Sequence, residues 1–259
     1  MESLLESFWA IKCVWLRYFA FYRKNIVFAI ITTFVEPLLY LLSFGFGVGG
    51  MVGGIEIEGI KLTYRQFVFA GVVAQTVLFQ GFFEAAYGGF VRMYYQKVFN
   101  SIAMTPITLS EILWAELLWD ASKAAFSASI VLLIGALSGE FSIIGSLMSV
   151  PAVFLFAMTF AGLGLLTAAR SATIDDISYP QFLFIFPMFL FCGIFFPLGQ
   201  MPAILQHFAW LLPLTSVVSI IRGFTLGLPF ATKAFFIFGI WLTSSVILSR
   251  KFMHKRLVK

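Results

Sequence analysis

Ionisable side chains that lie inside otherwise apolar stretches are the residues of this chain with the greatest potential for chemistry. They are Glu36, Glu84, Glu116, Asp120 and Lys123. An unpaired charge inside a bilayer is costly, so such residues either pair with one another or face a polar path. We therefore expect Lys123 to pair with Asp120, with Glu116 or with a carboxylate of a neighbouring span.

Two interpretations of these intramembrane charges are open. They form either a polar wall on a substrate path or a static ion pair that holds helices together. Helix rise places Glu36, Glu84, Asp120 and Lys123 in the inner half of the membrane. Replacing Lys123 and Glu36 by neutral residues would separate the two interpretations.

Groups for catalysis, metal binding or nucleotide chemistry are missing from the sequence. It contains no Walker-type phosphate loop and no Cys/His cluster with metal-ligand spacing. His207 and His254 have no nucleophile and acid at a recognisable spacing, and Cys13 and Cys192 form no disulfide framework. We predict no enzyme activity, no metal site and no cofactor in this chain, so any ATP is bound by another subunit.

Composition places the chain in a membrane. Hydrophobic residues make up 61% of the 259 residues, 11% are charged, and the mean hydropathy is +0.98. A soluble domain needs far more polar surface. The net charge of +5 lies beside apolar spans, which favours anionic lipid headgroups rather than nucleic acid as the partner. The length predicts one integral membrane domain, residues 1–259.

The predicted fold is an all-α polytopic membrane protein with six transmembrane helices. An N-terminal amphipathic helix, residues 3–24, is expected to lie in the membrane interface, because apolar side chains from Phe8 to Tyr22 recur at helical spacing. The six spans are expected at residues 25–47, 66–90, 112–137, 141–169, 179–196 and 230–249.

Residues 177–221 contain no charged side chain and decide the topology. As one helix they would extend about 67 Å, against about 30 Å of hydrocarbon. Crossing twice would place the basic C-terminus on the side with few cations, so the positive-inside rule favours six spans with both termini cytoplasmic. The remainder, residues 197–228, is predicted to be a re-entrant outer hairpin with helices at 203–211 and 214–227.

The polar interval 92–109 is the predicted cytoplasmic coupling loop. We expect a short helix over 93–103 that stops before Thr105-Pro106, with Ser110 capping the next helix. This segment is either a surface that receives force from a partner or a solvated loop between two spans.

Two long motifs carry a resemblance to a known family. The stretches FVRMYYQKVFNSIAMTPITLSEILWAE and FFPLGQMPAILQHFAWLLPLTSVVSIIRGFTLG resemble the permease subunits of ABC-2 type exporters, most of all the branch that exports lipo-oligosaccharide nodulation factors. The resemblance implies a homodimer with a second permease copy in the bacterial cytoplasmic (inner) membrane. It also implies two copies of a separate ATPase, which hold ATP and Mg.

The resemblance also assigns roles to residues. Thr105-Pro106 and Glu111 match the family's Thr-Pro and following acid, whereas Asn100 stands where many relatives carry an acid. The implied ATPase coupling residues are Arg92, Gln96, Lys97, Asn100, Thr105 and Pro106. The implied outer gate consists of Pro197, Pro202, Gln206, Pro213 and Arg222.

The cargo suggested by the resemblance is a lipo-oligosaccharide, glycolipid or polysaccharide. An exporter of drugs or other amphipathic small molecules is the alternative. An ion-driven carrier or channel would rest on Glu36, Asp120 and Lys123, but the chain shows no inverted repeat, which such carriers often contain. A membrane enzyme is disfavoured because no catalytic cluster is present.

Overall fold

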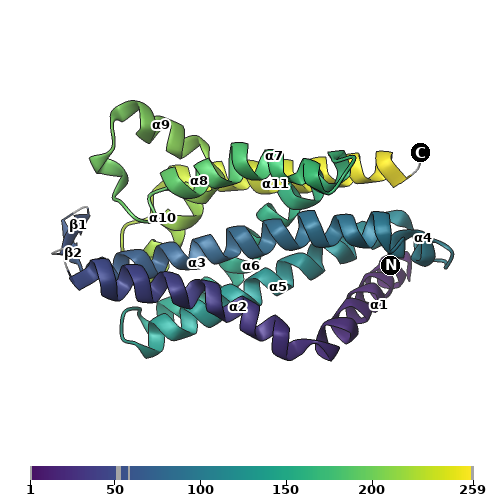
Figure 1. Cartoon of the computed structure of the whole chain (residues 1–259), viewed down its shortest axis with the longest axis horizontal. Helices are drawn as coiled ribbons and strands as arrows, with labels where there is room; N and C mark the ends of the chain where they lie inside the picture. Colours follow the sequence, from purple (N-terminus) through teal and green to yellow (C-terminus); the bar gives the residue numbers. More distant parts are fainter. Residues whose placement is uncertain (1, 51–53, 58, 258–259) are drawn as a thin grey trace.

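The protein is described here from a computed structural model that covers residues 2–50, 54–57 and 59–257. Four long helices run along the length of the molecule (Figure 1). They are α3 (Tyr64–Phe83), α5 (Leu109–Leu137), α6 (Ile143–Arg170) and α11 (Thr232–Leu257). The helix α3 continues through two π-helical segments, η3 (Glu84–Gly88) and η4 (Val91–Tyr95).

Capping boxes start two of these helices. Thr63 Oγ1 accepts a hydrogen bond from the Gln66 backbone nitrogen at 3.2 Å, and Gln66 bonds back to the Thr63 nitrogen at 3.0 Å. Thr108 and Glu111 form the same capping box at the start of α5. The predicted cap, Ser110, is therefore wrong by two residues, because Thr108 carries a Glu three residues later and satisfies two backbone donors.

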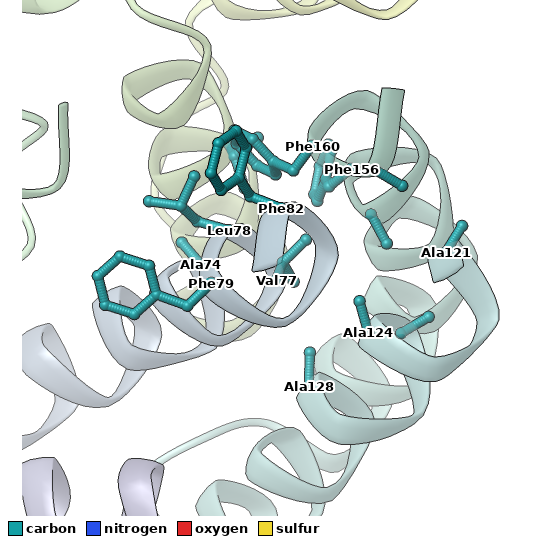
Figure 2. Packing of buried hydrophobic residues seen from close by; sticks show 14 of the residues in the cluster. Ala74, Val77, Leu78, Phe79, Phe82, Ala121, Ala124, Ala128, Phe156 and Phe160 are labelled. Carbon is teal, nitrogen blue, oxygen red and sulfur yellow. The ribbon is translucent and has the colours of Figure 1, made fainter. Parts of the chain in front are cut away.

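The core lies where α3, α5 and α6 meet. Figure 2 shows Phe82 of α3 beside Phe156 and Phe160 of α6, and the small side chains Ala121, Ala124 and Ala128 on α5. Gly164 of α6 lies so close to α3 that an added Cβ would meet the Phe82 carbonyl oxygen at 2.5 Å. Small residues of this kind let helix backbones approach closely where lipid offers no hydrophobic drive.

The N-terminal helix α1 (Glu2–Lys24) packs on α5 with part of its aromatic face. The ring centroids of Trp15, Tyr18 and Tyr22 lie 5.7, 6.0 and 5.7 Å from that of Trp119. Other apolar side chains of α1 are exposed, namely Leu5, Phe8, Trp9, Leu16, Phe19 and Phe21. The helix is thus anchored to the bundle while a second apolar surface stays uncovered, and its place in the membrane interface stays a prediction.

Within the described residues, four continuous helices are long and apolar enough to cross a membrane, or five if one bent pair counts as a span. The helix α2 (Ile26–Tyr40) contains Pro37 and continues as the π-helical segment η1 (Leu41–Gly47) and the 3-10 turn η2 (Val48–Gly50). The predicted fifth span is short: η5 (Asp175–Ile177), α7 (Ser178–Pro180), η6 (Gln181–Ile185) and α8 (Phe186–Phe191) precede Gly193, whose φ is +80°. From Ser178 to Phe191 it rises only about 21 Å. The count of six spans stays a prediction.

The bent pair is the predicted hairpin. The helices α9 (Ala203–Leu211) and α10 (Pro213–Leu226) meet at 89°, and 3-10 turn η7 (Leu198–Gln200) precedes them. Leu212 is extended because a residue before proline is driven out of the helical region. The two predicted helices agree with the structure to within one residue at each end, whereas entry of the hairpin into the membrane stays a prediction.

Two short strands interrupt the otherwise helical fold. The strands β1 (Ile55–Ile57) and β2 (Ile60–Leu62) pair antiparallel, with Glu56 opposite Lys61. The prediction of an all-α chain missed this ribbon, which lies at one end of the molecule near α9 and α10 (Figure 1). The helices α1 and α4 (Val98–Ala103) lie at the other end.

Candidate functional site

Arg92 lies at the centre of a buried ion cluster. Its Nε and Nη2 contact Glu116 Oε1 at 2.7 and 2.6 Å, and its Nη2 donates to Asp120 Oδ1 at 2.8 Å. Its Nη1 donates to Glu84 Oε1 at 3.0 Å. Glu116 and Asp120 stand one turn apart on α5, while Glu84 and Arg92 come from the π-helical continuation of α3. One guanidinium therefore joins two helices through three carboxylates.

Lys123 completes the cluster from one turn further along α5. Its Nζ lies 2.5 Å from Glu84 Oε2, so the predicted pairing with a carboxylate of a neighbouring span is confirmed. Two tyrosines of α1 cover the cations: the Arg92 guanidinium lies 5.4 Å from the Tyr18 ring centroid, and Lys123 Nζ lies 5.3 Å from that of Tyr22. The cluster thus ties α1 to α3 and α5.

The charges of the cluster do not cancel. Arg92 and Lys123 face three carboxylates, and the side chains of Glu116 and Asp120 are 0% exposed. Glu116 Oε2 and Asp120 Oδ2 are buried without a hydrogen-bond partner among the described residues. Removing one partner from a buried ion pair typically costs about 3–5 kcal/mol, because the remaining charge is left uncompensated. The ion cluster therefore stabilises the packing of the α3 continuation against α5, and this stabilisation depends on Arg92.

A pocket of about 710 Å³ opens beside the cluster. Arg92, Lys123 and Glu84 form part of its wall, and α1 contributes Arg17 and Lys24. The aromatic lining residues are Tyr18, Phe21, Tyr22, Tyr87 and Trp119. Cations and flat aromatic faces together suit a polar ring compound or an anionic group rather than a cation. The same cluster thus joins two helices through its ion pairs and forms part of the wall of this pocket.

Glu36 is separate from this cluster. It lies on α2, lines a different groove with Tyr40 and Ser43, and its side chain faces the buried amide of Gln75. No ion pair joins it to another residue in the part of the chain that the structure covers. The structure thus brings together four of the five intramembrane charges, not all five.

The predicted coupling helix is divided in two. The segment η4 ends at Tyr95, and Lys97 has a φ of +50° before α4 begins at Val98. A left-handed residue other than glycine is strained by about 1–3 kcal/mol. Lys97 therefore forms a sharp joint where the sequence predicts a continuous helix over 93–103.

The segment after this joint presents one face to solvent. Val98, Phe99 and Ile102 are buried against the bundle. Met104 is 88% exposed, and the Thr105 hydroxyl donates to the Ile102 carbonyl oxygen at 2.6 Å, which closes the turn before Pro106. The exposed predicted coupling residues are Gln96, Lys97, Asn100, Thr105 and Pro106. Arg92, which the resemblance placed with them, instead points into the ion cluster.

The predicted outer-gate residues have structural roles at the opposite end. Pro197 and Pro202 precede η7 and α9, and Pro213 begins α10. Gln206 Nε2 donates to the Met201 carbonyl oxygen at 2.8 Å. Arg222 of α10 is buried, and its Nη2 donates to the Gly193 carbonyl oxygen at 2.8 Å. These contacts hold the segment after α8 against the bent pair.

Sequence reasoning missed most of the aromatic lining of the inner site. Tyr18, Tyr22 and Trp119 line the pocket, although the tyrosines were assigned to headgroup depth. The spacing of the two tyrosines on one face of α1 was the available signal. It predicts an apolar face but not whether lipid or protein covers it. The left-handed joint at Lys97 gave no signal, because no glycine or asparagine marks it.

Comparisons with known proteins agree with this architecture. Residues 10–226 match the family model described as ABC-2 type transporter. The chain is 34% identical to nodulation protein J of Bradyrhizobium diazoefficiens over 81% of this chain and 78% of that protein. It is 31% identical to nodulation protein J of Rhizobium meliloti, over 88% of this chain and 86% of that protein. It is 22% identical to the inner membrane transport permease YadH of Escherichia coli, over 86% of this chain and 85% of that protein. The chain therefore belongs to the ABC-2 type transporter family, as an integral membrane component of a transporter.

Proposed function

We propose that this protein is the permease half of an ATP-driven exporter whose cargo is a lipo-oligosaccharide. The similarity to nodulation protein J from rhizobia, which extends over four fifths or more of this chain, carries the proposal. A separate ATPase binds ATP and Mg, because the sequence contains no phosphate loop of its own. Two permeases and two ATPases form the working assembly in the bacterial inner membrane, with both termini cytoplasmic.

The exposed face around α4 receives the force in this proposal. Gln96, Lys97, Asn100, Thr105 and Pro106 are exposed on one segment, while the apolar side of that segment packs on the bundle. Arg92 lies five residues before Lys97 and is fixed to three carboxylates. A displacement of α4 by the ATPase pair is therefore passed through η4 to α3 and α5, which biases the spans between two arrangements.

The pocket beside the ion cluster receives the cargo head in this proposal. Its tyrosines and Trp119 offer flat faces for sugar rings, and Arg17 and Lys24 offer donors to hydroxyl and acidic groups. It lies next to α1, whose exposed apolar side chains would meet the acyl tail in the membrane. A cationic drug fits this lining less well, because Arg17, Lys24, Arg92 and Lys123 face the cavity.

Reconstitution into vesicles tests this function. We would co-express the chain with a candidate ATPase subunit from the same organism and measure ATP-dependent transfer of a labelled lipo-oligosaccharide across the vesicle membrane. Transfer should require both subunits and should stop when the Walker lysine of the ATPase is replaced. Transfer by the permease alone, driven by a proton gradient, would instead establish the ion-driven carrier.

The cargo is tested in the same vesicles. A lipo-oligosaccharide should stimulate the ATPase, and an amphipathic drug of similar size should not. Replacing Tyr22 by Ala should weaken the stimulation, because it removes one aromatic wall of the pocket. Replacing Phe8 by Ala, an exposed aromatic on the same helix that does not line this pocket, is the matched control. Stimulation by the drug alone would support the alternative exporter.

A further inference from the structure

A second pocket, of about 390 Å³, lies between the β1–β2 ribbon and the bent pair α9–α10. The β ribbon, α9 and α10 lie at the end of the molecule opposite α1 and α4 (Figure 1). Ligand pockets span roughly 300–1,000 Å³, so this cavity has room for a small polar group. Its ionisable and hydrogen-bonding lining includes Glu56, Gln206, Thr215, Ser219, Arg222 and Lys233.

Arg222 is buried at this pocket without a carboxylate. The residue is 7% exposed, and its guanidinium lies 3.7 Å from the centroid of the Phe67 ring. Its hydrogen bonds to described residues all use Nη2, which donates to the carbonyl oxygens of Gly193, Phe67 and Ile194 at 2.8, 3.3 and 3.4 Å. Its Nε is buried and has no hydrogen-bond partner within the described part of the chain. Such a donor normally finds an acceptor, since an unmade buried hydrogen bond is costly.

Lys233 supplies a second cation to the same pocket. Its Nζ lies 3.8 Å from the ring centroid of Trp210, and it forms no ion pair with any residue the structure covers. Glu56 is the one acid among the lining residues that the structure describes, and it stands opposite Lys61 in the β ribbon. Two cations against one carboxylate give the described part of the lining a net positive charge.

This combination has the chemistry of a phosphate site. An arginine with unused donors, an ammonium and the hydroxyl of Ser219 match the oxygen acceptors of a phosphate group. Next to the pocket, α9 exposes Ile204, Phe208 and Leu211, which form an apolar surface suited to lipid chains. We propose that this pocket binds a phosphate group through Arg222 and Lys233, carried by an anionic membrane lipid or present as free phosphate. The proposal is independent of the cargo and of the ATPase.

Calorimetric titration of the purified full chain in an uncharged maltoside detergent tests this site. The ligands are inorganic phosphate, dihexanoyl phosphatidylglycerol and dihexanoylglycerol, which lacks the phosphate. We expect phosphatidylglycerol to bind and dihexanoylglycerol not to bind. Binding of inorganic phosphate with similar affinity would identify free phosphate as a sufficient ligand, whereas binding of the phospholipid alone would identify a lipid headgroup.

Variants connect any binding to this pocket. Lys233→Gln should weaken binding at least fivefold, and Arg222→Gln should abolish it. Lys251→Gln, an exposed cation near the other end of the same helix α11, is the matched control and should bind as the parent protein does. Because Lys233 is exposed, its replacement keeps the test valid even where Arg222→Gln fails to fold. Equal affinity of Lys233→Gln and the parent, or equal binding of dihexanoylglycerol, would overturn the proposal.

Discussion

Arg92 and Arg222 are both largely buried, yet they have opposite surroundings. Arg92 meets three carboxylates at 2.6–3.0 Å, whereas Arg222 meets only backbone carbonyl oxygens and the face of Phe67. Every nitrogen of the Arg92 guanidinium is engaged by a carboxylate oxygen, while Nε of Arg222 has no partner among the described residues. Arg92 therefore holds two helices together through its ion pairs, whereas Arg222 has a donor left for a ligand.

The positions of the two arginines fit this division. Arg92 stands between α4 and the bundle, on the path along which the proposed coupling would transmit a motion. Arg222 stands in the bent pair at the opposite end, beside a cavity of about 390 Å³. A charge that is fully paired resists movement, because every displacement separates it from a partner. A charge held only by carbonyl dipoles can accept a further anion.

The comparison is tested most strongly by Arg92→Met. This change leaves the buried carboxylates of Glu116 and Asp120 without the cation that pairs with them, so we expect a loss of about 3–5 kcal/mol in the free energy of unfolding. In detergent, this loss of stability would appear as a large fall in the midpoint temperature of thermal unfolding. Arg23→Met, at an exposed position on α1, should shift the midpoint little. Partial recovery on adding Glu116→Gln would show that uncompensated charge is the cause, and no recovery would contradict it.

Arg222→Met is expected to have a smaller effect. It removes hydrogen bonds to carbonyl oxygens and leaves no charge behind, so the expected loss is about 1–3 kcal/mol. The same unfolding measurement applies, with the two methionine variants compared side by side. A loss of stability as large as that of Arg92→Met would show that Arg222 mainly stabilises the fold. It would remove the contrast between the two sites.

Lys97→Val tests the joint between the cluster and α4. A β-branched side chain tolerates the left-handed φ of +50° poorly, so we expect a loss of about 1–2 kcal/mol. Lys97→Gly removes the same charge but accepts this backbone, and it should unfold at a temperature close to that of the parent. If Val and Gly behave alike, the backbone of Lys97 is not a strained joint and the path from α4 to Arg92 is less rigid.

Asn100→Asp should have the smallest effect on stability. Asn100 is exposed on α4, and surface substitutions usually change the free energy of unfolding by less than about 0.5 kcal/mol. In the proposed assembly it should nevertheless alter the affinity for the ATPase, and the change should shrink at high salt. Ser101→Asp, at the neighbouring exposed position, is a useful comparison. Unchanged affinity at both positions would count against α4 as the contact surface.

Much of the fold could be predicted because local rules decide it. Pro213 fixes the break between α9 and α10, and the lack of charge over residues 177–221 required a fold-back or a second crossing. The predicted ranges of α5 and α6 also agree with the structure to within three residues. These features depend on backbone sterics and on composition, which short stretches of sequence carry.

The candidate site was predictable only in part. Lys123 was expected to pair with a neighbouring carboxylate, since a lone charge in lipid is unfavourable. Arg92 was assigned to the cytoplasmic surface because it begins a polar interval of the sequence. The π-helical continuation of α3 brings it back against α5 instead. Glu36 was grouped with the cluster by depth alone, and depth says nothing about which way a helix faces.

The sequence by itself determined that this is a helical membrane protein, that the bent pair breaks at Pro213, and that its buried charges must find partners. Only the tertiary structure decided that Arg92 meets Glu84, Glu116 and Asp120 while Arg222 meets no described carboxylate. The reason is physical: composition and local sterics act over a few residues, whereas ion pairs and pockets form between helices that are distant in sequence. Their partners depend on how those helices rotate and pack.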